Sequence, residues 1–236
     1  MLMPAAGVTG VSVLSWETAL ALRDMALLQP DLPKYLLAPE VAVLLSQFED
    51  ERQRMLFAFL WNTGARITEA LMVTPEDVQL DGLRPFVRLR TLKQRNRGRG
   101  RPGKDEKIAR VVPLLDATFV RELRRYLATF RPGRRTPLFA VTRKTAWIWL
   151  QQALERAAAT GIGFSVDSVS PRTFRHSFAM QLFLNHVPPK VVQTYMGHER
   201  YESTEQYLKI FALDVAPQLG IRFSLDAQDF MGMLMK

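Results

Sequence analysis

The spacing of apolar and polar residues predicts a chain that is mostly helical. Residues 15–29 ("SWETALALRDMALLQ") follow the helical period, and Ser15 is suited to cap the first turn. Residues 39–64 contain enough apolar positions for two helices, and Gly64 can adopt the left-handed conformation that ends a helix. Residues 65–73 predict a further helix.

The pattern changes to an alternation of apolar and basic residues between residues 84 and 115. "RPFVRLRTLK" and "KIARVVPLL" each have the period of a half-buried strand, and together they predict an antiparallel β-hairpin with a long tip. Helical patterns return afterwards, in residues 116–130, 143–161, 171–186 and 189–196. The expected fold class is α+β, a mostly α-helical body with one small antiparallel sheet that carries a long basic hairpin.

Two tryptophans, Trp147 and Trp149, lie in one of these helical segments. Aromatic side chains can stack on nucleic-acid bases, but on an amphipathic helix they more commonly pack into a core. We therefore expect both tryptophans to be core residues.

The segment "MGHERYESTEQYLKIF" combines a histidine with a tyrosine nine positions later. On one straight helix nine residues turn through about 900°, which would put His198 and Tyr207 on opposite sides. Gly197 can end the preceding helix, and Ser203 with Gln206 forms a capping-box pattern that predicts the start of the next one. Two helices joined by a turn would bring the histidine and the tyrosine together.

Charge changes the picture from a helical domain to one with a polyanionic partner. The chain of 236 residues has 32 Lys and Arg against 23 Asp and Glu, a formal net charge of +9 and a pI near 10.2. These values favour nucleic acid, although many other proteins are basic. With no cysteine and only three histidines, the sequence excludes disulfides and thiolate zinc sites, and we expect no metal and no cofactor. No stretch is apolar enough to span a membrane, so we expect a cytoplasmic protein associated with the nucleoid or a plasmid.

The predicted hairpin concentrates this charge. Between residues 84 and 110 there are eleven basic residues and only two acids, Asp105 and Glu106. Such a tip is either a solvated loop or a contact for DNA phosphates, and we expect the second. The residues expected to bind DNA are Arg88, Arg90, Arg95, Arg97, Arg99, Arg101 and Lys107.

Two short segments outside the hairpin place arginines where they could bind a phosphate. Arg66 directly follows a Gly turn, and Glu69 three residues later could orient its guanidinium group. Arg172 and Arg175 lie three apart on one face of a predicted helix, with His176 beside them. The alternative is that Arg66 only pairs with Glu69 at a helix start and that Arg175 is a surface residue.

These segments resemble a known family. "TGARITEAL" (residues 63–71) and "SPRTFRHSFAMQLFLNHVPPKVVQTYMGHERYESTEQYLKI" (residues 170–210) resemble the arginine and tyrosine boxes of the tyrosine recombinases, also called the phage integrase family. The resemblance covers residues 36–212 and implies an integrase-like catalytic domain there. Residues 1–35 would then form a short helical segment and connector, and residues 213–236 a tail with a helix exchanged between copies.

The resemblance also implies a role for each matching residue. Arg66 and Arg175 would clamp the phosphate, His198 would be the histidine of the family's Gly-His box, and Tyr207 would be the nucleophile. The general acid would be Lys93, with Lys104 as a competitor because the hairpin is long. The implied catalytic residues are Arg66, Lys93, Arg172, Arg175, His198 and Tyr207, supported by Glu69, His176 and Lys104.

The chain departs from the family pattern at three places. Arg172 stands where the family commonly has a histidine, and a guanidinium cannot act as a base near neutral pH. His186 stands where the family usually has Gly, so we expect a left-handed backbone there. The N-terminal part is too short for a full core-binding domain.

The implied reaction is cutting and rejoining of DNA strands through a 3′-phosphotyrosyl intermediate, without a metal or ATP. The implied partners are double-stranded DNA, further copies of the chain in a tetramer on DNA, and an accessory DNA-binding protein. Two alternatives remain: a nicking and closing enzyme like the type IB topoisomerases, and a DNA-binding protein of the same fold without catalytic activity.

Overall fold

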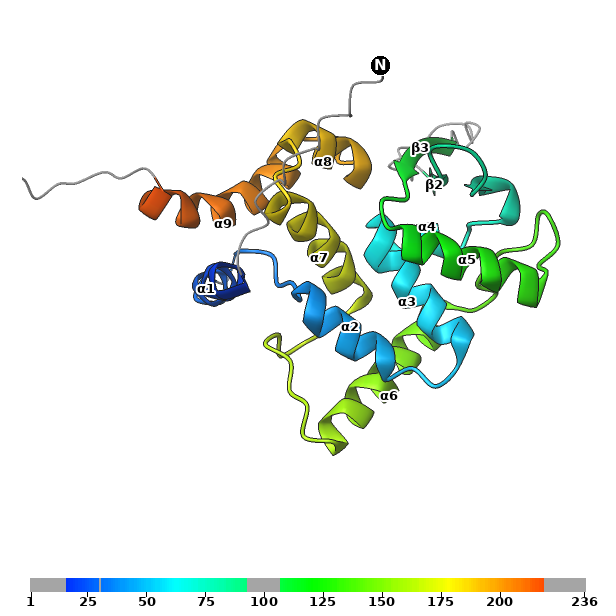
Figure 1. Cartoon of the computed structure of the whole chain (residues 1–236), viewed down its shortest axis with the longest axis horizontal. Coiled ribbons are helices and arrows are strands. Elements are labelled where there is room, and N and C mark those ends of the chain that lie inside the picture. The colour runs from blue at the N-terminus through cyan, green and yellow to red at the C-terminus, as the bar shows by residue number, and fades with distance from the viewer. Residues whose placement is uncertain (1–15, 30, 93–106, 219–236) are drawn as a thin grey trace, which may run out of the picture.

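The protein folds into a mostly helical body with a small sheet on one side (Figure 1). The computed structural model describes residues 16–29, 31–92 and 107–218. The expected α+β class is confirmed, as are the hairpin strands and the order of the longer helices. The elements are α1 (Trp16–Leu27), α2 (Ala38–Ser46), α3 (Glu51–Thr63), α4 (Ile67–Ala70), the 3-10 turn η1 (Pro75–Asp77), β1 (Val78–Gln79), β2 (Phe86–Leu92), β3 (Lys107–Pro113), α5 (Ala117–Phe130), α6 (Arg143–Ala159), α7 (Pro171–Leu184), α8 (Pro189–Met196) and α9 (Glu202–Gln218).

Side chains of the preceding residue fix the starts of several helices. Asp50 accepts a hydrogen bond from the Arg52 backbone N–H at 2.7 Å, and Asp116 caps α5 in the same way. Ser170 caps α7, with Pro171 at the first helical position. Each of these caps joins residues at most three apart, so it needs no tertiary contact.

Helices α3 and α7 pack against each other at the centre of the core (Figure 1). Residues 55–60 of α3 are all buried, and the Phe57 ring lies 5.3 Å from that of Phe174 on α7. Gly64 ends α3 with φ +59°, and a Cβ there would lie 2.3 Å from the Phe178 ring. Glycine is therefore needed at this turn for its backbone angle and for the close approach of α7.

The sheet has the strand order β1-β2-β3, and both pairs are antiparallel. In the hairpin, Phe86 pairs with Pro113 and Leu92 with Lys107. The two-residue strand β1 was not predicted, since two residues are too short to show a period. The helix predicted for residues 65–73 is also shorter than expected, because α4 makes a single turn.

The expectation for the two tryptophans is half wrong. Trp149 packs partly buried against the core, but Trp147 is 52% exposed. Residues two apart on a helix point about 200° away from each other, so α6 could bury only one of the pair.

Helix α1 packs against α9, although the two are far apart in the sequence (Figure 1). Leu22 and Ala26 of α1 are buried in the core. Lys34 donates hydrogen bonds from its ammonium group to the Leu27 and Gln29 carbonyls at 3.1 and 3.2 Å, which satisfies the end of α1.

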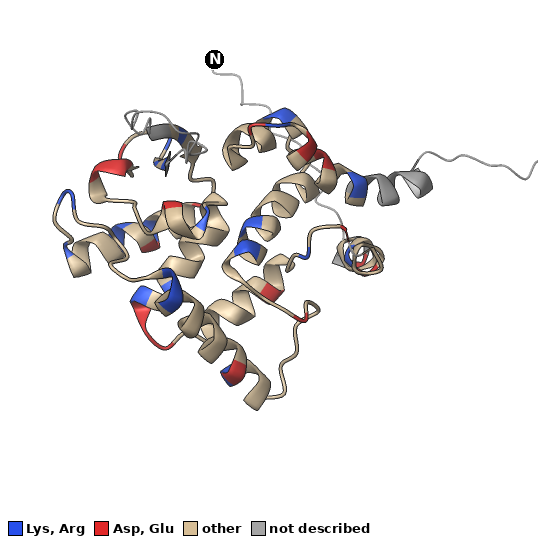
Figure 2. Ribbon diagram, turned by 180° about the vertical axis from the view of Figure 1, so that it is seen from behind, with Lys and Arg blue, Asp and Glu red and all other residues tan. Residues whose placement is uncertain are grey.

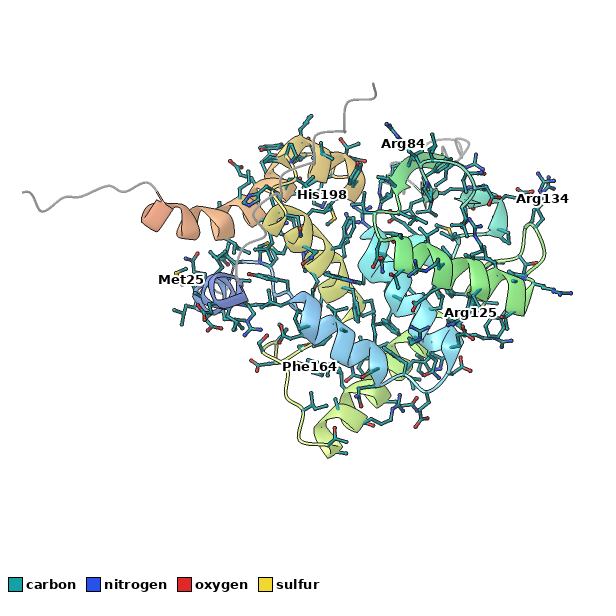
Figure 3. All side chains as sticks on the ribbon, in the orientation of Figure 1. Met25, Arg84, Arg125, Arg134, Phe164 and His198 are labelled. Carbon is teal, nitrogen blue, oxygen red and sulfur yellow. The ribbon has the colours of Figure 1, made fainter. Side chains whose placement is uncertain are left out.

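Arginines on the sheet and α5 side of the molecule point outward. Figure 3 shows Arg84, Arg125 and Arg134 at the periphery, on the side away from α1 and α9. Within the described residues, no helix is long and apolar enough to cross a membrane. His186 adopts the expected left-handed backbone, with φ +56°.

Candidate active site

Arg66 is held at the turn between α3 and α4. Its backbone N–H donates to the Glu69 carboxylate at 2.8 Å, and its guanidinium group forms an ion pair with the same carboxylate at 2.8 Å. The Glu69 side chain is buried, whereas that of Arg66 is 43% exposed. One edge of the guanidinium group is thus fixed while another part remains accessible, as the spacing of Arg66 and Glu69 predicts.

Arg110 on β3 shares this carboxylate, and sequence reasoning missed its place in the site. Its Nη1 and Nη2 donate to the two Glu69 oxygens at 2.8 and 2.7 Å, and its Nε donates to the Tyr195 carbonyl at 2.8 Å. A Cβ at Gly197 would lie 2.7 Å from the Arg110 side chain. Arg110 therefore links the Arg66 turn to the end of α8.

Arg175 lies inside the same cluster and is only 7% exposed. Its guanidinium group donates to the carbonyls of Gly64 and Met196, each at 2.5 Å. Both carbonyls end helices, where the partial negative charge favours a cation. Burial, and then the charges of Arg66 and Arg110, lower the pKa of Arg175 to about 9, so it remains a cation at neutral pH.

Figure 2 shows the basic residues of α7 near the middle of the molecule. Arg172, which lies one turn before Arg175, is exposed. The two therefore differ in environment, although the charges of both act on the same tyrosine. A buried guanidinium next to an exposed one fits a site that an anion enters from the surface.

His198 lies in the turn after α8, where α7, α8 and α9 come together (Figure 3). Gly197 makes this turn with φ +61°, as the sequence predicts. The His198 Nδ1 is 2.8 Å from the Thr204 hydroxyl, and Gln193 donates to the His198 carbonyl at 3.2 Å. Burial, followed by the charge of Arg175, lowers the pKa of His198 to about 3, so the imidazole is neutral at pH 7.

Tyr207 stands beside these residues but is 1% exposed. Its ring lies parallel to that of His198, at 6.3 Å between centroids, and its hydroxyl oxygen is 2.7 Å from the His176 Nδ1. The break at Gly197 thus brings histidine and tyrosine together as expected. Helix α9 begins at Glu202, however, so the expectation that Ser203 caps it is wrong: Ser203 lies inside the first turn.

The pKa of Tyr207 also differs from the simplest expectation. Two nearby arginines should favour the phenolate, and the charges of Arg175 and Arg172 do lower this pKa. Burial has the larger effect and raises the pKa of Tyr207 to about 12. In this conformation the phenol is neutral and covered.

Comparison of the sequence with known proteins identifies the family of the chain. A sequence model of the phage integrase family matches residues 34–212. The chain belongs to this family.

Two relatives of this tyrosine recombinase match nearly the whole of its chain. A probable site-specific recombinase in the afa region of Escherichia coli is 51% identical over 214 residues, which cover 91% of this chain and 85% of that protein. A resolvase of Escherichia coli is 44% identical over 94% of this chain and 90% of its own length. XerD of Mycobacterium leprae is 34% identical over 75% of this chain, and the match covers 56% of XerD.

Solved structures support the tyrosine recombinase fold. The crystal structure of XerA recombinase superposes with a TM-score of 0.60 at 20% identity and covers 83% of this chain and 66% of XerA. The catalytic domain of bacteriophage HP1 integrase matches with a TM-score of 0.51 at 18% identity, over 80% of this chain and 95% of that domain. At these identities the likeness shows the fold.

The structure brings together most of the predicted site residues of this recombinase. Arg66, Arg175, His198 and Tyr207 converge from four separate segments, with Glu69 and His176 in direct contact with two of them. Arg172 lies at the surface beside them. Lys93, Lys104, Arg95, Arg97, Arg99 and Arg101 lie outside the described residues, and Lys107 is the first residue of β3.

Two of the basic residues predicted to bind DNA have partners inside the protein. Arg88 donates to the Glu76 carbonyl at 2.5 Å, and Arg90 forms an ion pair with the buried Asp77. Both contacts attach the sheet to η1. Across residues 16–29, 31–92 and 107–218 there is no group of three or more His, Asp and Glu side chains placed to hold a metal ion.

Proposed function

We propose that this tyrosine recombinase cuts and rejoins DNA by transesterification, with Tyr207 as the nucleophile and a 3′-phosphotyrosyl intermediate. The observation that carries the proposal is the convergence of Arg66, Arg175, His198 and Tyr207 around one region. Cations, a neutral imidazole and a phenol match the needs of a phosphodiester that gains negative charge as it is attacked.

The two arginines take different parts in this reaction. Arg66 is partly exposed and would meet the phosphate first, while buried Arg175 would donate to a non-bridging oxygen from behind. Arg175 would then exchange a carbonyl partner for the phosphate. Both groups stay charged at neutral pH and offset the charge of the five-coordinate phosphorus.

His198 is suited to donate a hydrogen bond to the phosphate. When its Nδ1 accepts a hydrogen bond from the Thr204 hydroxyl, the imidazole proton lies on Nε2 and is available to the substrate. The residue is neutral at pH 7 because its pKa is low, so it would act as a donor and not as a cation.

Tyr207 must move before it can attack. The phenol is covered in the present conformation, and its hydroxyl is engaged with His176. We propose that DNA binding, or assembly on DNA, shifts α9 and exposes the phenol. An enzyme whose nucleophile is covered until its substrate is in place avoids cutting at wrong sites.

The proposed substrate is double-stranded DNA held partly by the basic hairpin. The net charge of +9 and the basic tip support this, as do solved structures of the same fold such as XerH bound to its difH substrate. If the whole protein neutralises six to ten phosphates, its affinity for DNA should fall by about 10³–10⁵ between 50 and 200 mM salt. Binding that is insensitive to salt would contradict this part of the proposal.

We propose resolution as the biological outcome, that is, recombination between two sites in one DNA molecule. The support is the 44% identity to a protein named resolvase over 94% of this chain. Two plasmids test it, one with the two sites in direct repeat and one with them in inverted repeat, because exchange between direct repeats yields two smaller circles and exchange between inverted repeats inverts the DNA between them. A resolution enzyme should act on the first plasmid and not on the second, and joining of two separate plasmids would indicate integration.

The general acid that protonates the leaving 5′-oxygen is proposed to be Lys93, with Lys104 as the alternative. A DNA substrate with sulfur in place of the bridging 5′-oxygen tests the choice, because a thiolate leaves without a proton. If replacing one lysine slows cleavage of ordinary DNA but not of the sulfur-containing substrate, that lysine is the general acid. Replacement of the other lysine should affect both substrates equally.

Tetramer formation on DNA and the need for an accessory DNA-binding protein are further parts of the proposal. Residues 224–236, whose apolar side chains include Phe230 and Leu234, are proposed to dock on a neighbouring copy; they lie outside the described residues. Deleting them should reduce the formation of multi-protomer complexes on DNA more than binding to a single site. Equal loss of both would contradict the proposed exchange.

The central experiment traps the covalent intermediate. DNA duplexes selected for binding from a randomised pool are nicked near the expected cleavage point, so that the cleaved end diffuses away and the adduct accumulates. Wild-type protein should form the adduct, Tyr207→Phe should not, and both should bind DNA equally. Tyr201→Phe is the matched control, because Tyr201 is exposed in the neighbouring turn.

Three results are informative in this experiment. An adduct with Tyr207→Phe would identify another nucleophile. The absence of an adduct with wild-type protein that binds the duplex would favour the DNA-binding protein without catalytic activity. Relaxation of supercoils without exchange between two sites would indicate a nicking and closing enzyme.

A further inference from the structure

We propose that His176 accepts the phenol proton of Tyr207 during strand cleavage and returns it during rejoining. This inference rests on the proposed function, since it concerns the same phenol. It assigns the acceptor to a residue other than Arg172, whose guanidinium group cannot take up a proton near neutral pH.

In the covered conformation the imidazole already contacts the reacting atom, and the proposal requires that this contact is kept when α9 shifts. The His176 Nδ1 is 2.7 Å from the Tyr207 hydroxyl oxygen, within the range for direct proton transfer. The two rings are 5.7 Å apart between centroids, with an interplanar angle of 52°. His176 also follows Arg175 directly on α7, so the residue that takes the proton is adjacent in the chain to one that would hold the phosphate.

The other imidazole of the site is placed differently. His198 lies face to face with the Tyr207 ring, and its Nδ1 contacts the Thr204 hydroxyl. His198 therefore packs on the Tyr207 ring, whereas His176 contacts the Tyr207 hydroxyl. In the proposal, His198 donates a hydrogen bond to the phosphate and His176 accepts the proton of the phenol.

The charge state of His176 suits an acceptor. The titratable groups that face it are Arg172 and Arg175 on α7, Tyr207 on α9, and His198 in the turn before α9. Burial, and then the charges of Arg172 and Arg175, lower the pKa of His176 to about 4. At neutral pH the imidazole is unprotonated and the phenol holds its proton, so the phenol donates to Nδ1 and the imidazole proton lies on Nε2.

Substrate binding should strengthen this base. The arginine charges that disfavour a protonated His176 are the ones that a bound phosphate would neutralise. With the phosphate present, the part of the lowering that the arginines cause is offset, while the larger part, caused by burial, remains. The pKa of His176 rises to that extent, and proton transfer from the phenol becomes easier. The base therefore becomes effective when the DNA arrives.

The proton balance closes over both steps. In cleavage, the phenol oxygen bonds to phosphorus, the bond from phosphorus to the 5′-oxygen breaks, and the phenol proton moves to the His176 Nδ1. The leaving 5′-oxygen takes a proton from the general acid. In rejoining, a 5′-hydroxyl attacks the phosphotyrosine and gives its proton to the general acid, which was deprotonated in cleavage. The bond from phosphorus to the phenol oxygen breaks, and protonated His176 returns its proton to that oxygen.

The test compares two variants of His176 on the nicked DNA substrate in a single turnover. His176→Ala removes the acceptor, whereas His176→Asn keeps an oxygen that can accept a hydrogen bond but cannot take up a proton. Both should lower the cleavage rate by about 10²–10⁴-fold, with unchanged DNA affinity. His186→Asn is the matched control, because His186 is an exposed histidine with a left-handed backbone that Asn tolerates.

Chemical rescue separates a proton acceptor from a structural contact. Free imidazole should restore part of the His176→Ala rate, and the restored rate should rise with pH through the pKa of imidazole itself. A structural role would not produce this pH profile. Urea denaturation shows whether His176→Ala is folded. If it is not, His176→Asn decides the outcome, because it retains most of the side-chain volume and the hydrogen bond.

The opposite result is equally clear. Cleavage by both His176 variants at the wild-type rate or faster would show that the hydrogen bond only holds Tyr207 in its covered position, and the proposal would be wrong. If wild-type protein and His186→Asn form no adduct at all, the proposed function fails and the base assignment fails with it. An adduct with these two proteins and unchanged rates for the His176 variants removes only the base assignment.

Discussion

The two halves of the candidate site are built in different ways. The arginine half is held by charge-assisted contacts: Glu69 bridges Arg66 and Arg110, and Arg175 donates to two helix-ending carbonyls. The tyrosine half depends on ring packing and a hydrogen bond between Tyr207 and His176. Under the proposed function, the first half would bind the phosphate as it stands, while the second would have to change before it reacts.

Under the proposed function, this difference separates binding of the phosphate from the chemical step within one site. A site with fixed cations can bind a backbone phosphate before any rearrangement. A covered phenol adds a step that the protein can couple to correct binding. Variants in the two halves should therefore fail in different ways.

The largest effect is expected when the arginine half loses its fork-shaped donor. Arg175→Lys keeps a positive charge but cannot donate to the Gly64 and Met196 carbonyls and a phosphate with the same geometry. We expect the single-turnover cleavage rate to fall by about 10²–10³-fold. Arg134→Lys, at the exposed periphery, should leave the rate unchanged; a similar loss in both variants would contradict the assignment.

The next effect concerns the carboxylate that bridges two arginines. Glu69→Gln leaves Arg66 and Arg110 close together without the buried charge between them. The free energy of unfolding should fall by about 3 kcal/mol, roughly 150-fold in the folding equilibrium. Urea denaturation measures it, with Glu76→Gln as the control, because Glu76 pairs with exposed arginines whose contacts contribute little.

A pH titration examines the tyrosine half directly. Because burial raises the pKa of Tyr207 to about 12, against about 10 in the unfolded chain, its ionisation is disfavoured about 100-fold in the folded protein. The stability that follows from this shift is fully present below pH 10 and is lost as the pH rises through 12. The difference in phenolate absorbance between wild type and Tyr207→Phe should show a midpoint near 12 when folded and near 10 in urea. A folded midpoint near 10 would mean that the phenol is already accessible.

The smallest effect tests the turn that positions Arg66. Gly64→Ala meets a strained backbone angle and the Phe178 ring, whereas Gly82→Ala meets a similar strain, at φ +96°, in open space. The first variant should therefore be less stable than the second by about 2 kcal/mol, roughly 30-fold in the folding equilibrium. Equal losses in the two variants would show that the backbone angle alone makes Gly64 necessary.

Local signals in the sequence predict much of the fold. Helix caps such as Ser170, the left-handed Gly64 and Gly197, and the alternation in β2 and β3 all act over a few residues. The pairing of Arg66 with Glu69 is also local, since the two are three residues apart. Features of this kind can be predicted without knowing how helices pack.

The parts of the site that depend on packing were not predictable in the same way. Arg110 contacts Tyr195 from a position 85 residues away, so nothing near Arg110 distinguishes it from the other basic residues of the hairpin. The contact between His176 and Tyr207 depends on how α7 and α9 lie against each other. The burial of Tyr207, which outweighs the nearby arginines in setting its pKa, is likewise a tertiary property.

The packing of α1 against α9 ties the beginning of the described chain to the helix that carries Tyr207. Any tag, fusion or neighbouring molecule that displaces α1 removes a support of α9 while leaving every proposed catalytic side chain chemically intact. A change at α1 could therefore alter the position of the proposed nucleophile from outside the site.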